Sequence, residues 1–159
     1  MDREKYMSLA MELAREAGNA GEVPVGCVVV DESGRVIGRG RNRREEGHDA
    51  TAHAELEAIR EACAATGDWR LSGCSIFVTL EPCPMCAGAI VQARVPRVVI
   101  GSMNPKAGCC GSVLDMLHEK RFNHRCEVRT DVEKDACAAL MSDFFAALRE
   151  QKLKKLENE

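Results

Sequence analysis

The sequence predicts an α/β fold, in which helices cover the faces of a central β-sheet. Segments with helical and with strand periodicity alternate along the 159 residues, and this length suffices for one sizeable core. The composition, 45% hydrophobic and 30% charged, is ordinary for a globular protein. We therefore expect a single domain over residues 1–159, without internal repeats or a long low-complexity segment.

The first half of the chain predicts a helix, a hairpin, a loop and a second helix. Residues 3–18 carry apolar side chains at near-helical spacing and end at Gly18. Residues 25–40 contain two β-rich runs around the turn signal "ESGR", which indicates a hairpin. The polar segment 42–51 is expected to be a loop, and residues 52–67 again show the pattern of an amphipathic helix.

The second half predicts strands and helices in alternation, which implies a sheet with helices on its faces. The expected elements are a buried strand at 73–80, a helix at 84–94, a strand at 96–102, a loop at 103–111, a short helix at 112–120, a strand at 125–132 and a closing helix at about 132–156.

The charge and the chain start limit the classes of function. The formal net charge of −3 argues against a chain that is basic overall, but a local basic face is still compatible with it. No apolar run approaches the roughly 20 residues of a membrane span. The start "MDREKYMSLA" lacks the apolar stretch of a signal peptide, so we expect a cytoplasmic protein without membrane contact.

Nine cysteines, an odd number, are expected to be reduced thiols in this setting. Two of them, Cys109 and Cys110 in "AGCCGS", leave metal ligation open, although no neighbouring residue completes a ligand set. Five others lie in apolar surroundings and are expected to act as small core residues. These are Cys27, Cys63, Cys74, Cys126 and Cys137.

Two short motifs carry the residue types that bind zinc. The motif at 53–55 places His53 and Glu55 two positions apart, and the motif at 82–86 contains Cys83 and Cys86. The two cysteines are one helical turn apart, so their sulfurs lie on the same side. One imidazole and two thiolates make three ligands, and no fourth is evident. Three ligands and an open position are typical of a catalytic zinc rather than a structural one.

The local sequence indicates that both motifs open helices. Pro82 and Pro84 fit the first turn, where helix amides have no internal partner. Thr51 is expected to be the N-cap of the helix that follows it, so that the ion lies beyond the helix end and His53 and Glu55 both reach the pocket that holds it. Glu55 would then stay outside the metal shell and move protons between water and substrate.

Simpler interpretations of each residue remain open at this point. A single histidine is most often a hydrogen-bonded core or surface residue, and a single Cys-x-x-C motif is also found as a redox pair. A glutamate near a helix start often only caps it. The joint occurrence of both motifs, with a helix and a strand between them, favours the metal site.

These motifs resemble those of the zinc-dependent nucleobase deaminases, whose signature is H-x-E followed by P-C-x-x-C. Within that superfamily the chain resembles the bacterial tRNA-specific adenosine deaminases over nearly its whole length. The segments that carry this resemblance are "EVPVGCVVV", "GRNR", "DATAHAE", "VTLEPCPMCAGAI", "RVVIGS", "PKAG", "FNHR" and "LMSDFF".

The resemblance implies a three-layer cytidine-deaminase-like fold with a central five-stranded mixed sheet, in a homodimer. It also implies hydrolysis of the wobble adenosine in a tRNA anticodon to inosine, with one zinc ion per chain. By the same resemblance, Asn42 hydrogen-bonds the flipped nucleoside, Ala54 offers its backbone to the base, and Val25 walls the pocket. A different possibility is that Asn42 only shapes the end of its strand.

One position departs from the family pattern. Many relatives carry an aspartate before the "PKAG" segment, where this chain has Asn104. Because asparagine removes a negative charge, we expect better tolerance of deoxyadenosine than in an aspartate-bearing relative.

Basic residues gather in four stretches that are candidates for phosphate contact. They are Arg39, Arg41, Arg43 and Arg44; Lys106; Lys120, Arg121, His124 and Arg125; and Arg149, Lys152, Lys154 and Lys155. Several of these stretches follow strands that are expected to lead to the mouth of the zinc site. Phe144 and Phe145 are candidates either for stacking on an anticodon base or for the core of the last helix.

Two other functions compete with tRNA deamination. A small-molecule guanine, cytosine or cytidine deaminase would share the zinc residues, but the basic stretches and the "FNHR" and "DFF" segments argue against it. A non-catalytic, zinc-stabilised RNA-binding scaffold would not need Glu55.

Overall fold

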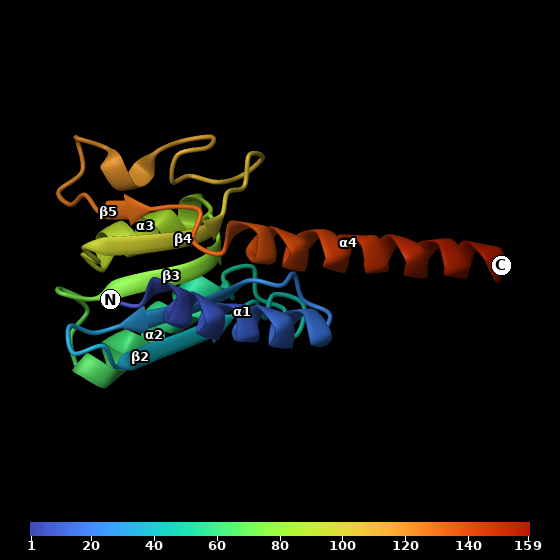
Figure 1. Cartoon of the computed structure of the whole chain (residues 1–159), viewed down its shortest axis with the longest axis horizontal. Coiled ribbons are helices and arrows are strands. Elements are labelled where there is room, and N and C mark those ends of the chain that lie inside the picture. The colour runs from blue at the N-terminus through green and yellow to red at the C-terminus, as the bar shows by residue number, and fades with distance from the viewer.

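The computed structural model describes residues 1–159 and contains one five-stranded sheet (Figure 1). The strand order is β2-β1-β3-β4-β5; β1 pairs with β2 and β3 in antiparallel fashion, whereas β3, β4 and β5 run parallel. This confirms the expected mixed sheet. The strands are β1 (Gly26–Val30), β2 (Val36–Arg41), β3 (Ser75–Leu80), β4 (Arg97–Ser102) and β5 (Glu127–Arg129).

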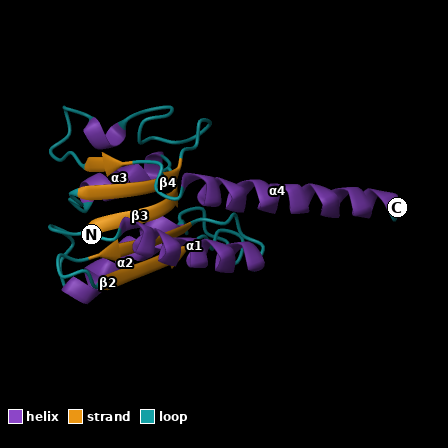
Figure 2. Cartoon of the chain, viewed as in Figure 1, coloured by secondary structure: helices purple, strands orange, loops and turns teal.

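Helices cover both faces of this sheet, as Figure 2 shows. They are α1 (Arg3–Asn19), α2 (Ala54–Thr66), α3 (Pro84–Gln92), α4 (Lys134–Glu157) and a short 3-10 helix, η1 (Met116–His118). One core cluster joins α1 and the start of α4 to side chains such as Phe77 and Val99. The other joins α2 and α3 to side chains such as Ile76 and Ile100, which lie on the opposite face.

The hairpin expected around "ESGR" is present and has a clear local cause. The carboxylate of Asp31 accepts hydrogen bonds from the backbone N–H groups of Ser33 and Arg35, at 2.9 and 3.0 Å, and from the Ser33 hydroxyl. Gly34 takes a φ of 88°, a conformation that glycine adopts without strain. These bonds close the turn between β1 and β2.

Two glycines of β2 let α2 lie directly against the sheet. A Cβ on Gly38 would come within 2.1 Å of the carbonyl oxygen of Ala58, and one on Gly40 within 2.0 Å of that of Ala54. The start of α2 is therefore held at a distance that only glycine permits.

The region between β4 and α4 differs most from expectation. The short helix expected at 112–120 is only the single turn of η1, because residues before it form a tight turn in which Gly111 donates to the carbonyl of Leu114 at 2.8 Å. The strand expected at 125–132 is reduced to three residues, which pair only with the first half of β4 at the sheet edge.

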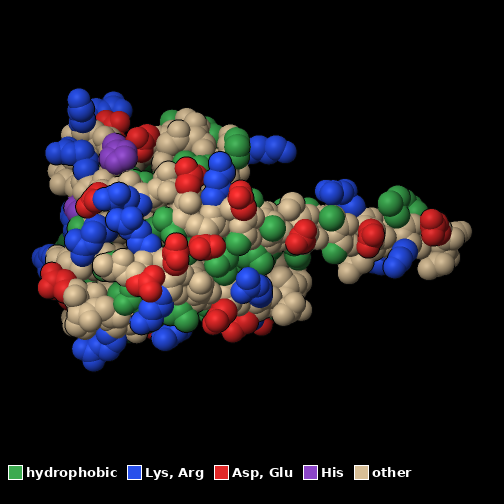
Figure 3. Space-filling view, in the orientation of Figure 1, with side chains coloured by type: hydrophobic (Ala, Val, Ile, Leu, Met, Phe, Trp, Pro, Cys, Tyr) green, Lys and Arg blue, Asp and Glu red, His purple; other side chains and the backbone are tan.

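The closing helix α4 leaves the body after its first turns and projects freely (Figures 1 and 3). Cys137 is buried, whereas Leu153 and Leu156 near the end are 61% and 68% exposed. Phe144 is half-buried and Phe145 is 38% exposed, so neither is the core residue that was one of the two expectations. No helix of the chain combines the length and apolar character that crossing a membrane requires.

Candidate active site

The structure brings His53, Cys83 and Cys86 together. Their possible ligand atoms all lie within 4.8 Å of one another. The Nδ1 atom of His53 is 3.6 Å from the Cys83 Sγ and 3.5 Å from the Cys86 Sγ. Bond lengths of about 2.3 Å to sulfur and 2.0–2.1 Å to nitrogen in a tetrahedral zinc site imply an N···S separation of about 3.5 Å. The three side chains therefore have the chemistry and the spacing to hold a metal ion.

Two helix starts produce this arrangement. His53 is the N-cap residue of α2 and Cys83 that of α3, both with extended backbone and without a side-chain capping bond. Their side chains are therefore free to turn toward each other, and Pro84 opens α3 without losing a helix hydrogen bond. The positive ends of both helices favour a thiolate there.

The expected N-cap at Thr51 is wrong. The Thr51 hydroxyl and N–H donate instead to the Asp49 carboxylate, at 2.7 and 2.8 Å, in a turn before the helix. The helix begins later, at Ala54, and His53 precedes it. This later start explains how His53 and Glu55, two positions apart, face one site: the histidine is outside the helix and the glutamate is in its first turn.

Hydrogen bonding shifts the pKa values of Cys83 and Cys86 in opposite directions. The bond from Cys86 is the main cause that lowers the pKa of Cys83 to about 4, so Cys83 is the thiolate of the pair. The same bond, together with burial, raises the pKa of Cys86. The pKa of His53 is raised chiefly by its hydrogen bond with Cys83. A metal ion binding to all three would displace a proton from Cys86.

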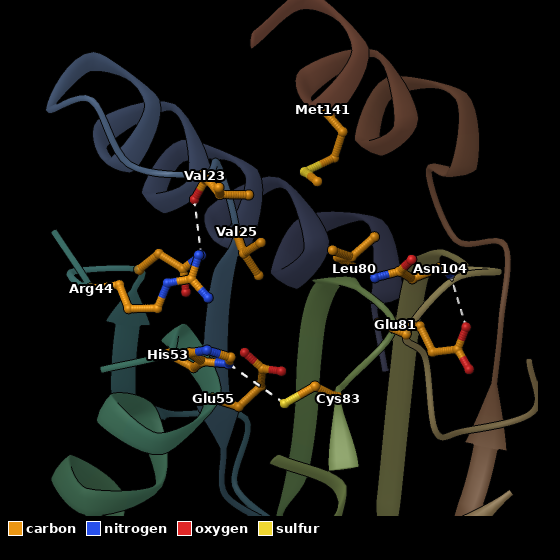
Figure 4. A pocket seen from close by; sticks show the side chains of 12 residues that line it. Val23, Val25, Arg44, His53, Glu55, Leu80, Glu81, Cys83, Asn104 and Met141 are labelled. Atoms are coloured by element: carbon orange, nitrogen blue, oxygen red, sulfur yellow. Dashed lines mark hydrogen bonds between the residues drawn. The ribbon is translucent and has the colours of Figure 1, made fainter. Parts of the chain in front are cut away.

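Glu55 is buried beside the ligand set without being part of it. It is 4% exposed and lies beside Cys86. Burial raises its pKa to about 7. Figure 4 shows the side chains of His53, Glu55 and Cys83 converging at the base of one pocket. A buried carboxyl group at that place can exchange protons with a molecule in the pocket.

The pocket above these residues has a volume of about 260 Å³. Val25 lines one side, Asn104 and Leu80 line another, and Met141 of α4 adds to the wall (Figure 4). Asn42 also lines the pocket. Five segments far apart in the chain therefore form the walls. Lys106 borders an adjoining pocket that shares Leu80, Asn104 and Met141.

Asn42 is fixed by two hydrogen bonds within the chain. Its Nδ2 donates to the carbonyl of Val23 at 3.1 Å, and its Oδ1 accepts from the backbone N–H of Ala54 at 3.3 Å. The side chain therefore ties the end of β2 to the start of α2. It keeps one N–H and one acceptor site for a ligand, because a carboxamide has two of each.

Most of the candidate phosphate-binding residues are engaged or distant. Arg41 pairs with Glu46 at 3.0 Å, and Arg43 pairs with Glu57 at 2.8 Å. His124 contacts the carbonyl of Val95 just before β4, at the end of the sheet opposite the ligand set, so the stretch from 120 to 125 is not one of those that lead to the pocket. The stretch from 149 to 155 lies on the projecting half of α4.

Arg44 is the basic residue at the pocket itself. It is exposed, lines the pocket and forms no ion pair. Its loop is anchored by Glu22, a 2% exposed carboxylate that accepts from the backbone N–H groups of Glu45 and Glu46 at 3.1 and 2.7 Å. Sequence reasoning missed Glu22 because nothing in its neighbours shows which loop it meets.

Glu81 is the second residue that sequence reasoning missed. It is 2% exposed and lines the pocket, but its carboxylate points away from Glu55 toward Asn104 (Figure 4). A charged residue between an apolar strand and a proline, directly before Cys83, was the available signal.

Cys109 and Cys110 are buried, and neither belongs to the ligand set. Of the five cysteines expected in the core, four are buried and Cys63 is only half-buried.

Comparison with known proteins agrees with this geometry. The MafB19-like deaminase family matches residues 1–149. The tRNA-specific adenosine deaminase of Bacillus subtilis (strain 168) is 48% identical over 149 residues, which cover 94% of this chain and 92% of that protein. The corresponding protein of Streptococcus pyogenes serotype M18 is 44% identical, with 92% of both chains covered.

Two solved structures show where the fold recurs. A structure from a study of A-to-I editing by tRNA:A34 deaminases at the wobble position of transfer RNA is 43% identical, with a TM-score of 0.82 over 86% of this chain and 98% of that one. A guanine deaminase from Nitrosomonas europaea is 27% identical, with a TM-score of 0.78 over 90% and 84%.

The fold and the three-ligand site with its buried glutamate therefore define a hydrolytic deaminase with the cytidine-deaminase-like architecture. Within that class, the identity and coverage of the bacterial relatives decide the family. The chain belongs to the tRNA-specific adenosine deaminases.

Proposed function

We propose that this enzyme converts adenosine to inosine at the wobble position of a tRNA anticodon, releasing ammonia, with one zinc ion held by His53, Cys83 and Cys86. The observation that carries this proposal is the spacing of the three ligand atoms, with the Glu55 carboxyl group beside them and the pocket above. When bound, the ion would lower the pKa of a water molecule, which becomes a nucleophile at neutral pH.

Glu55 is the proposed proton carrier. The reaction consumes one water and needs a proton first at a ring nitrogen of adenine and then at the leaving amine. A single carboxyl group can carry two protons in turn: it takes the first from water and delivers it to the ring nitrogen, and it then takes the second from the oxygen added to C6 and delivers it to the leaving amine. Its burial excludes competing bulk water and keeps the group fixed at the pocket base.

The pocket walls are proposed to hold a base that has left the stack of the anticodon loop. Val25 would contact the base, the backbone of Ala54 and the free N–H of Asn42 would orient the nucleoside, and Asn104 would lie at the sugar. Arg44 and Lys106, on the two loops that flank the opening, would contact phosphates.

An alternative is a small-molecule deaminase acting on guanine, cytosine or cytidine. The likeness to the Nitrosomonas europaea guanine deaminase favours it, because the two chains share the fold at 27% identity. The higher identity to tRNA-specific relatives weighs more heavily.

We also propose that the enzyme works in the cytoplasm as a homodimer. Val113 and Leu114 are 54% and 56% exposed and lie just before η1, which packs against α3; they would be covered in such a dimer. Light scattering on the purified protein tests this, and a mass of 17.4 kDa would contradict it.

The deciding experiment compares substrates. Zinc-loaded protein is incubated with an anticodon stem-loop, with free adenosine, guanine, cytosine and cytidine, and ammonia and inosine are measured together with metal content. We expect turnover of the stem-loop at a kcat/KM far above that of the free compounds. Preferred turnover of a free base would establish the alternative, and RNA binding without ammonia release would indicate a scaffold.

A further inference from the structure

The carboxylate of Glu81 accepts four hydrogen bonds. Its Oε1 accepts from the backbone N–H of Asn104 at 2.9 Å and from the Ser112 hydroxyl. Its Oε2 accepts from the backbone N–H groups of Cys110 and Ser112 at 2.9 and 3.0 Å. All four donors belong to residues 103–115, which we call the β4–η1 loop.

All the hydrogen bonds that the Glu81 carboxylate accepts come from the β4–η1 loop. Glu81 is 2% exposed and has no lysine or arginine partner, so only these four bonds offset the cost of burying its charge. Charge-assisted bonds of this kind are roughly twice as strong as neutral ones. A Cβ on Gly108 would lie 2.1 Å from the Glu81 Cδ, which shows that the loop closes directly onto the carboxylate.

The same loop also contacts the turn that carries the metal ligands. The N–H of Cys109 donates to the carbonyl of Pro82 at 2.8 Å, one residue before Cys83. Asn104, at the start of the loop, lines the pocket, and its Oδ1 accepts from the N–H of Lys106 at 3.3 Å. The position of both side chains at the opening therefore depends on how firmly Glu81 holds the loop.

We infer that Glu81 is a positioning residue for substrate: its buried carboxylate fixes the β4–η1 loop so that Asn104 and Lys106 meet the RNA. This inference rests on the proposed function, in which the loop contacts the nucleoside and its phosphates. Glu81 does not touch the reacting atoms. Cys86 lies within α3 and Cys83 is its N-cap residue, so we expect both to keep their places when the loop is loosened.

Glu81→Gln is the first test, because it keeps the shape but turns an NH2 group toward N–H donors. We expect KM for the anticodon stem-loop to rise about tenfold, which equals about 1.4 kcal/mol, while kcat stays within about twofold. Zinc content stays at one per chain. Hydrogen exchange of residues 103–115 accelerates, while that of α2 and α3 is unchanged.

Three further variants separate positioning from charge and from folding. Glu81→Asp keeps the charge but is one methylene too short, so it should raise KM as Glu81→Gln does. Ser112→Ala removes one donor, should give a smaller rise, and replaces the Glu81 variants if they fail to fold. Glu22→Gln, at the matching buried carboxylate of the other loop, should leave exchange of 103–115 unchanged.

The outcomes are distinct. An unchanged KM in Glu81→Gln, full recovery in Glu81→Asp, or an equal fall of kcat with stem-loop and free adenosine would overturn the inference. If the unmodified enzyme does not turn over the stem-loop, the proposed function fails instead. Loop exchange still reports on Glu81 in that case, and unchanged exchange in Glu81→Gln would overturn its role.

Discussion

Replacing Gly40 by alanine should weaken zinc binding although Gly40 contacts no ligand atom. A Cβ at this position would lie 2.0 Å from the carbonyl oxygen of Ala54, where ordinary van der Waals contact begins at 3.4 Å. The neighbour is backbone and cannot rotate away, so β2 and the start of α2 must separate by about 1.4 Å.

This displacement falls next to His53, the residue before Ala54. Ligand distances in a metal site tolerate only about 0.2 Å, so zinc affinity should fall by about 10- to 100-fold. Overpacking should cost about 1–3 kcal/mol of stability, which leaves most of a typical folding free energy. If β2 moves rather than α2, the bond from Ala54 to Asn42 lengthens and the pocket wall is lost instead.

The assay is zinc competition with a chelating dye, combined with urea unfolding of the zinc-loaded protein. Gly18→Ala is the matched control, because its Cβ would meet only Pro24 Cβ at 3.5 Å, an ordinary contact. Wild-type zinc affinity and stability in Gly40→Ala would refute the reasoning, since they would mean that α2 does not depend on this close approach.

Three further predictions concern the reaction. Glu55→Ala should retain one zinc per chain but lose at least about 10²–10⁴-fold in kcat, measured as ammonia release; turnover near the wild-type rate would remove Glu55 from the mechanism. Arg44→Ala should raise KM for the stem-loop and lower the slope of log K against log salt by about one, while a free nucleoside analogue is unaffected. Equal effects on both substrates would count against phosphate contact. Asn104→Asp should reduce activity on a DNA hairpin more than on the RNA stem-loop, because a carboxylate at the opening repels the phosphates of both but can accept a hydrogen bond from the ribose 2′-hydroxyl, which only RNA has; equal effects on the two substrates would end that idea.

The features that could be predicted from sequence are those with local causes. The hairpin could be predicted because Asp31 and Gly34 lie within one turn. The start of α3 could be predicted from Pro84, and the shared side of Cys83 and Cys86 from their spacing of one helical turn. The meeting of His53 with the cysteines could be expected from ligand type, although 30 residues separate it from Cys83.

The features that escaped prediction depend on contacts between distant segments. Glu22 looks like a surface glutamate in sequence, and the place of Glu81 between an apolar strand and a proline indicates only that it is unusual. The backbone N–H groups that the two carboxylates accept from are visible only in the folded chain. Helical periodicity alone cannot show that α4 leaves the body, so the exposure of Phe145 could not be foreseen. The length of β5 also depends on a distant segment, because this edge strand pairs with β4 over only three residues.

The separation between pocket base and pocket walls explains how one fold serves relatives with different substrates. The base consists of two helix starts, where His53, Glu55 and Cys83 have positions fixed by the backbone. The walls come from Val25 before β1, from the ends of β2 and β3, from the β4–η1 loop and from Met141 of α4, and none of these wall residues holds a ligand. Changes in the walls can therefore alter the substrate without disturbing the metal. The fold shared with a guanine deaminase at 27% identity is consistent with this division. It follows that substitutions in the walls should act mainly on KM, whereas substitutions at the base should act on kcat or on metal content.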